Sequence, residues 1–200
     1  GTAMHAGLVG KDAIEKLCKI PVEVDIASEF RYRDPIIDEK TLCIYISQSG
    51  ETADTRAALK LAKSKGAKTL TITNVIGSSI TREADFTVYT HAGPEIAVAS
   101  TKAYTAQVVL LTVLAIHFAE ILGSYEQAKL EELKSEISSL PAKLETILEE
   151  ETTLKDIASK IYTEHDMYFL GRGTDYHVAM EGSLKVKEIS YIHSEAYASG

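Results

Sequence analysis

Two hydrophobic patterns alternate over the first 123 residues and predict an α/β fold. Short apolar or β-branched runs predict strands at residues 22–26, 42–46, 69–73 and 86–89. Apolar positions at helical spacing predict helices at residues 4–17, 27–32, 52–65, 80–84 and 101–123. Strands that alternate with helices form a central parallel sheet with helices on both faces, which is a three-layer sandwich. Ligands of such sheets bind at the carboxyl ends of the strands.

The pattern changes in the second half of the chain. Over residues 124–164, Glu, Lys, Leu and Ile recur at helical spacing and are interrupted only by Pro141, which indicates amphipathic connecting helices. We assign no chemistry to this segment. The α/β pattern then begins again, with a strand predicted at residues 167–170 and a helix from Asp175 onward.

The restart repeats the opening of the chain. Residues 173–177, GTDYH, match residues 1–5, GTAMH, and Gly182 matches Gly10. The order of elements is also the same. We therefore expect a fragment in three parts: a first domain at residues 1–123 whose preceding strand is missing, a helical connector at 124–165, and the start of a truncated second copy at 166–200.

The segment Ser47-Gln48-Ser49-Gly50-Glu51-Thr52 joins a predicted strand directly to a predicted helix. Such a junction presents free backbone N–H groups and the positive end of a helix dipole, which favours an anion such as phosphate. The hydroxyls of Ser47, Ser49 and Thr52 can each donate to phosphate oxygens. The alternative is that Ser49 or Thr52 merely caps the helix. Neither a Walker lysine nor a Gly-x-Gly-x-x-Gly sequence is present, which disfavours a nucleotide.

Residues 93–102 have the same plan of strand, irregular turn and hydroxyl residues before a helix. We interpret them as the second wall of the pocket, where Val98 to Ser100 offer backbone and hydroxyl groups to sugar hydroxyls. The alternative is a plain loop before a helix that Ser100 or Thr101 caps.

Glu181, Lys185 and Glu188 share one face of the last predicted helix, because their spacing is i, i+4 and i+7. One interpretation is a solvated ladder of opposite charges. The other is that Glu188 is a general base, since a carboxylate beside a lysine and a bound phosphosugar can move a proton between adjacent carbons.

Composition excludes several function classes. The formal net charge of -8 and the pI near 5.3 argue against nucleic acid, because phosphate backbones are bound by basic surfaces. Cys18 and Cys43 lie in apolar runs, which indicates core residues and the reducing cytoplasm rather than a disulfide. The longest apolar run, Val108–Ile116, is too short to span a membrane. The histidines have no metal-ligand spacing, and we expect neither a metal nor a cofactor.

Four segments together resemble the sugar isomerase (SIS) domains of the glutamine-dependent fructose-6-phosphate aminotransferase family. They are SQSGET at residues 47–52, NVIGSS at 74–79, HAGPEIAVASTK at 91–102 and EGSLKVKEISY at 181–191. The likeness runs the length of the chain. It implies a flavodoxin-like SIS fold and an enzyme that converts fructose 6-phosphate and glutamine to glucosamine 6-phosphate and glutamate.

The resemblance also implies roles for individual residues. Ser47, Gln48, Ser49 and Thr52 would hold the phosphate, with Thr2 and Ala3 at the edge of the pocket, and Val98 and Ser100 would contact the sugar. Glu188 would move the proton between C1 and C2, with Lys185 beside it. The family has a serine where this chain has Ala3, so one hydroxyl contact is lost.

The resemblance further implies a homodimer and an N-terminal glutaminase domain, which this chain lacks. A catalytic histidine and a Schiff-base lysine of the family lie beyond Gly200, so we expect this chain to be inactive by itself. Two alternatives stay open. One is a non-catalytic regulatory SIS module that binds a sugar phosphate, and the other is a different phosphosugar isomerase.

Overall fold

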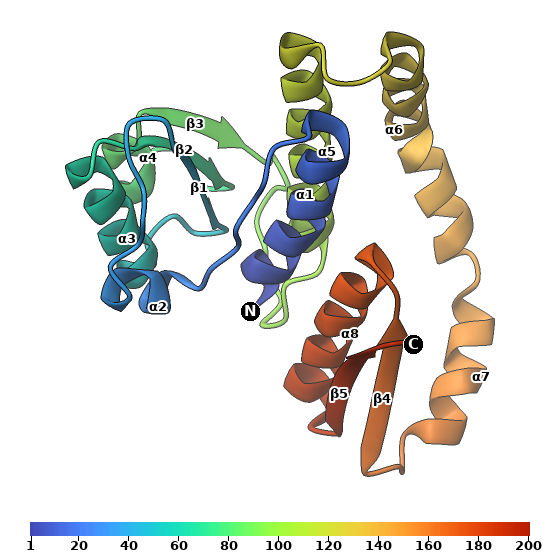
Figure 1. The fold of residues 1–200 in the computed structure, drawn as a ribbon. Coiled ribbons are helices and arrows are strands. Elements are labelled where there is room, and N and C mark those ends of the chain that lie inside the picture. The colour runs from blue at the N-terminus through green and yellow to red at the C-terminus, as the bar shows by residue number, and fades with distance from the viewer. The chain divides into compact units, whose positions relative to one another are not determined.

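The computed structural model describes all of residues Gly1–Gly200, and they form two compact units (Figure 1). Unit 1 comprises residues 1–11 and 22–111, and unit 2 comprises residues 12–21 and 112–200. Two helices, α1 (Thr2–Cys18) and α5 (Lys102–Leu122), contribute residues to both units. The predicted division into three parts along the sequence stays a prediction.

Unit 1 contains the predicted parallel sheet. Its strands are β1 (Leu42–Ser47), β2 (Lys68–Thr73) and β3 (Phe86–Tyr89), in the order β1-β2-β3. The central strand β2 is buried from Thr69 to Thr73, as expected for a strand with a neighbour on each side. The carboxyl ends of all three strands therefore lie at one edge of the sheet.

Helices cover both faces of this sheet, which confirms the α/β prediction. On one side lie α2 (Ala27–Tyr32), α3 (Ala53–Ser64) and α4 (Ser79–Glu83) (Figure 1). The Tyr45 hydroxyl of β1 donates to the Ala58 carbonyl of α3 at 3.0 Å, whereas the next residue, Ile46, lies against Gly7 of α1. Successive residues of β1 thus face opposite layers, as the period of a strand requires.

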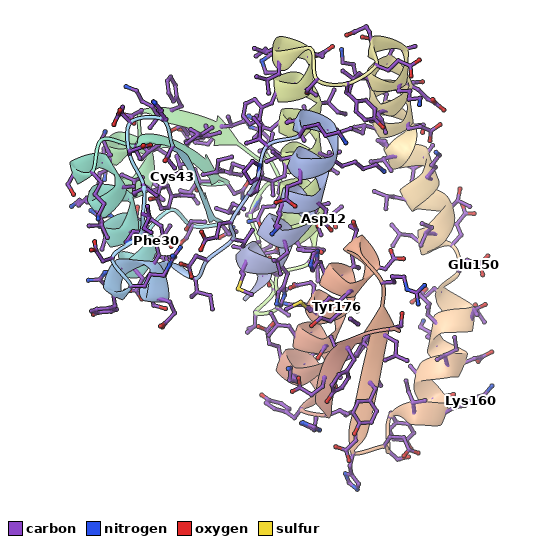
Figure 2. The ribbon with its side chains drawn as sticks, in the orientation of Figure 1. Asp12, Phe30, Cys43, Glu150, Lys160 and Tyr176 are labelled. Carbon is purple, nitrogen blue, oxygen red and sulfur yellow. The ribbon has the colours of Figure 1, made fainter.

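The main core of unit 1 lies between β1 and its helices. Its buried members are Tyr45, Ala58, Leu59, Ala62, Ala67 and Ile80. Phe30 and Cys43 pack against this cluster (Figure 2). Cys43 and the buried Cys18 are both free thiols whose pKa is raised by burial, which confirms the interpretation as core residues.

Unit 2 contains α6 (Gln127–Leu148), α7 (Glu151–Ile161), β4 (Asp166–Gly171), α8 (Thr174–Ser190) and β5 (His193–Ala198). β4 and β5 are parallel, with Asp166 paired to His193, and α8 connects them and packs on both. Like α1, α8 has 17 residues and a closely packed glycine, because a β-carbon at Gly182 would meet the Phe169 ring at 3.0 Å. Gly10 lies similarly close to Leu111 in unit 1.

Three local predictions were wrong or incomplete. Residues 22–26 are irregular rather than a strand, because they pair with no strand and Glu23 and Asp25 instead bind Arg33. Pro141 does not interrupt α6, and the break comes at residues 149–150. β5 was not predicted, since its sequence HSEAYA has no β-branched residue and forms by pairing with β4.

The apolar helix α5 is longer than the apolar run Val108–Ile116, which by itself is too short to span a membrane. Taken whole, its 21 residues are long and apolar enough to cross a membrane by length and composition. A core helix of a soluble protein meets the same test. Within unit 2, Ala115, Ile116 and Ala119 of α5 are buried, and the Cys18 thiol of α1 donates to the Ala115 carbonyl at 3.4 Å. These residues of α5 are part of the interior of unit 2, whereas Val113, Ile121 and Leu122 of the same helix are exposed.

Candidate functional site

The predicted anion loop, residues 47–52, follows β1 and leads into α3. Its turn depends on Gly50, which has φ +68°, in the region that favours glycine. The Gly50 N–H donates to the Ser47 hydroxyl oxygen at 3.0 Å, and the Glu51 N–H donates to the Ser49 hydroxyl oxygen at 3.3 Å. The backbone of the loop thus holds two of its three hydroxyl groups.

These hydrogen bonds determine where the hydroxyl protons can point. An oxygen that accepts from a backbone N–H has its own proton left to donate elsewhere. The Ser47 Oγ and Thr52 Oγ1 atoms lie 3.4 Å apart, and either hydroxyl can be the donor. When Ser47 donates to Thr52, the Thr52 hydroxyl can donate its own proton to a ligand. Ser49 and Thr52 are exposed, and their protons can reach an anion in solvent.

The capping alternative finds no support in this geometry. Thr52 occupies the N-cap position of α3, yet its side chain makes no capping hydrogen bond. Ser49 accepts from Glu51, which precedes the cap. The first N–H groups of this 12-residue helix therefore have no partner in the helix or in these side chains, and the helix dipole adds positive potential there.

Residues at the carboxyl end of β2 form hydrogen bonds to the loop. The Gln48 carbonyl accepts from the Asn74 N–H at 3.1 Å and from the Thr73 hydroxyl at 3.3 Å. Asn74 also donates to the Gly93 carbonyl at 2.6 Å, and its amide oxygen accepts from Thr90. At this edge of the sheet lies an open hollow of about 380 Å³, lined by Asn74, Val75, Ile76, His91, Gly93 and Pro94.

Sequence reasoning did not assign this hollow. The motif at 74–79 and the asparagine that ends a predicted strand were the available signals. The side-chain nitrogen of Asn74 donates to Gly93, and its side-chain oxygen accepts from Thr90 and Ala92, so this one amide binds residues 90–93.

The second predicted wall is an irregular segment before α5. Val98 is fully exposed, Ala99 is buried and Ser100 is half-buried. The N–H of Ala103 in the first turn of α5 donates to the Glu95 carboxylate at 3.2 Å, so a glutamate does the capping expected of Ser100 or Thr101. Thr2 and Ala3 are half-buried in the first turn of α1.

The second group of predicted site residues lies on α8, in unit 2. Lys185 Nζ is 2.5 Å from Glu188 Oε2 and 3.4 Å from Glu181 Oε1. The side chains of Glu181, Lys185 and Glu188 are 6%, 17% and 40% exposed. A solvated ladder does not describe this face, because only Glu188 is accessible enough to meet a ligand.

The N-terminal end of α8 is held by Asp12. The Thr174 hydroxyl donates to Asp12 Oδ2 at 2.9 Å, and His177 Nδ1 lies 3.0 Å from the same oxygen. Sequence spacing gave no signal for these contacts, which join residues more than 160 positions apart.

Comparison with known proteins connects these two groups of residues to one family. A family model described as "SIS domain" matches residues 1–117 and 160–200. Over 200 residues the chain is 65% identical to a glutamine–fructose-6-phosphate aminotransferase [isomerizing] from Clostridium tetani. Over 201 residues it is 50% identical to a protein of the same name from Thermococcus kodakarensis. In both cases the match covers 100% of this chain and 33% of the relative, so the chain spans about a third of their length.

A solved structure shows the same fold. The C-terminal domain of glucosamine-fructose-6-phosphate aminotransferase from Francisella tularensis superposes with a TM-score of 0.96 at 42% sequence identity. That match covers 99% of this chain and 56% of the other.

Proposed function

Because the chain belongs to the SIS domain family, we propose that it is the sugar isomerase part of an enzyme that makes glucosamine 6-phosphate from fructose 6-phosphate and glutamine. The observation that carries this proposal is the hydroxyl-lined loop at the carboxyl end of β1, whose protons and helix N–H groups are available to a phosphate. A neutral ligand would not need this arrangement.

In this proposal, Ser47, Gln48, Ser49 and Thr52 bind the phosphate group. Thr2 and Ala3 border it, and Val98 and Ser100 contact the sugar through backbone and hydroxyl groups. Ala3 has no hydroxyl, so the hydrogen bonds to the phosphate come from the other residues of the site. The hydroxyls donate to the phosphate oxygens as they do at other helix N-termini that bind anions.

Glu188 is the proposed general base. Isomerisation between a ketose and an aldose moves one proton between C2 and C1, and a single carboxylate can remove it from one carbon and return it to the other. Lys185 contacts this carboxylate at 2.5 Å and positions it. A regulatory module would need no such base, so this pair favours an enzyme over a sensor.

The whole activity requires parts outside this chain. The chain spans about a third of its relatives, and the glutaminase domain that releases ammonia from glutamine would belong to the remainder. We propose a cytoplasmic homodimer that needs no metal or cofactor. By itself, the 200-residue chain would bind a hexose 6-phosphate weakly and would not turn it over.

Calorimetric titration tests this proposal. The ligands are fructose 6-phosphate, glucosamine 6-phosphate and inorganic phosphate, and the proteins are the wild type and the Ser49→Ala, Thr52→Ala double variant. The control is Ser64→Ala, because Ser64 is an exposed hydroxyl at the far end of α3. We expect hexose phosphates to bind more tightly than phosphate and only the double variant to lose them. Equal binding by the double variant and the wild type would show that the loop is not the site.

A further inference from the structure

Glu51 joins the anion loop to a second segment, the turn Gly77–Ile80 at the start of α4. Its Oε1 accepts from the Ser79 N–H at 2.7 Å. The Gly50 carbonyl accepts from the Ile80 N–H at 3.1 Å. Two neighbouring residues of the loop are therefore bonded to two neighbouring residues of the turn.

Close packing adds a third contact between the same segments. The Ser78 side chain is buried and lies so near Gly50 that a β-carbon there would be 2.2 Å from the Ser78 hydroxyl oxygen. The Ser78 hydroxyl makes no hydrogen bond. Packing against Gly50 therefore accounts for the position of the Ser78 side chain, and it leaves no room for a β-carbon on residue 50.

The charge of Glu51 is unexpected beside an anion site, because like charges repel. Local groups compensate it. The hydrogen bonds from Ser79, and then the nearby Arg56 and Arg82, hold the pKa of Glu51 below its ordinary value. The Arg82 guanidinium donates to the Gly77 carbonyl at 2.8 Å, which places its charge at the same turn. An acidic side chain kept ionised here suits a task in positioning rather than in ligand contact.

We propose that Glu51 is a positioning residue for the anion loop, and that its carboxylate fixes the loop to the Gly77–Ile80 turn through the Ser79 N–H. The loop hydroxyls then keep the orientation that a phosphate requires without reorganising when it binds. This inference rests on the proposed phosphate site.

The hydrogen bond and the charge make different predictions for substitutions. Glu51→Gln keeps an acceptor oxygen for Ser79 and removes the repulsive charge, so its anion affinity equals or exceeds that of the wild type. Glu51→Ala removes both, and the freed loop lowers anion affinity by about fivefold or more. A purely repulsive carboxylate would give the opposite result for the alanine variant.

The donor can be removed without touching Glu51. Ser79 is the first residue of α4, where proline is tolerated, and Ser78 has φ -61° and ψ 163°, which suits a residue before proline. Ser79→Pro should lower anion affinity as Glu51→Ala does. Ser79→Ala keeps the N–H and removes only the hydroxyl, which also acts on Glu51, so it should bind anions more tightly than Ser79→Pro.

The experiment is titration of these four variants with inorganic phosphate and glucosamine 6-phosphate, with thermal unfolding of each. Glu39→Ala is the control for a lost surface carboxylate, because Glu39 is exposed and lies before β1. The proposal is supported if folded Glu51→Ala and Ser79→Pro bind anions more weakly than the wild type, Glu51→Gln binds at least as tightly as the wild type, and Ser79→Ala binds more tightly than Ser79→Pro. Should Glu51→Ala fail to fold, the Ser79 pair decides by itself.

Two results overturn the inference. In the first, Glu51→Ala or Ser79→Pro binds as tightly as the wild type while the Ser49→Ala, Thr52→Ala double variant loses affinity; the phosphate site then stands and Glu51 has no positioning role. In the second, neither the wild type nor any variant binds phosphate, and the proposed function fails together with this inference.

Discussion

Gly50 and Ser78 lie in such close contact that a β-carbon on residue 50 would fall 2.2 Å from the Ser78 hydroxyl oxygen and 2.6 Å from its β-carbon. Both distances are far below van der Waals contact. With φ +68° at Gly50 as well, this position accommodates only glycine. The path of the anion loop is thus determined by contact with a segment that follows the next strand.

Gly50→Ala should both destabilise unit 1 and weaken anion binding. We expect a loss of about 2–4 kcal/mol in the free energy of unfolding, from backbone strain and from the clash with Ser78. Gly77→Ala is the matched control, because Gly77 has φ +73° with no atom within 4 Å of a β-carbon. It should cost about 1 kcal/mol, from strain alone. Urea unfolding followed by circular dichroism measures the free energy of unfolding of both variants. Equal losses in the two variants would show that the Ser78 contact is unimportant.

Asp85 should make the stability of unit 1 depend on pH. Hydrogen bonds from Lys63 and then from Thr69 lower the pKa of Asp85 to about 2, below the ordinary value of 3.8. A carboxyl with a lowered folded-state pKa stabilises the protein above its unfolded pKa and loses this contribution as pH falls through the folded value. The stabilisation is therefore present above about pH 4 and is lost toward pH 2.

The corresponding variant is Asp85→Asn. It should reduce the free energy of unfolding by about 1–2 kcal/mol at pH 7, and the difference from the wild type should shrink toward zero near pH 2. Chemical unfolding at a series of pH values measures it, with Glu39→Gln as a control. A difference that does not change with pH would contradict the assignment.

Asp12 should stabilise the start of α8. Its carboxylate accepts from Thr174 at 2.9 Å and contacts His177 at 3.0 Å, so Asp12→Ala should cost about 1–2 kcal/mol of unfolding free energy in unit 2. Asp156→Ala, at an exposed position of α7, should cost little. Hydrogen exchange of the α8 amides reports the local effect, and unchanged exchange in Asp12→Ala would exclude it.

Glu188→Gln tests the proposed general base in a full-length enzyme. We expect kcat for isomerisation to fall about 10²–10⁴-fold while KM for fructose 6-phosphate changes little, since an amide cannot take the proton. Glu195→Gln, at another exposed carboxylate of unit 2, should leave kcat unchanged. If Glu188→Gln kept more than about a tenth of the wild-type kcat, another group would have to be the base.

The sequence by itself determined most of the elements of this protein. Strands β1, β2 and β3, helices α3, α5 and α8, and the parallel sheet were predicted from the spacing of apolar residues. The turn at residues 47–52 between β1 and α3 was predicted as well, whereas its binding of an anion stays a prediction. These features are local, because the period of apolar positions and the residues of a turn can be read within one short window.

Only the tertiary structure decided which groups the polar side chains form hydrogen bonds with. The carboxylate of Glu51 bonds to Ser79, that of Glu95 to Ala103 in the first turn of α5, and that of Asp12 to Thr174. Likewise, residues 22–26 stay irregular, whereas residues 193–198 become β5 through pairing with β4. A hydrogen bond or a strand pair depends on a partner that packing brings within about 3 Å, and no local pattern encodes that distance.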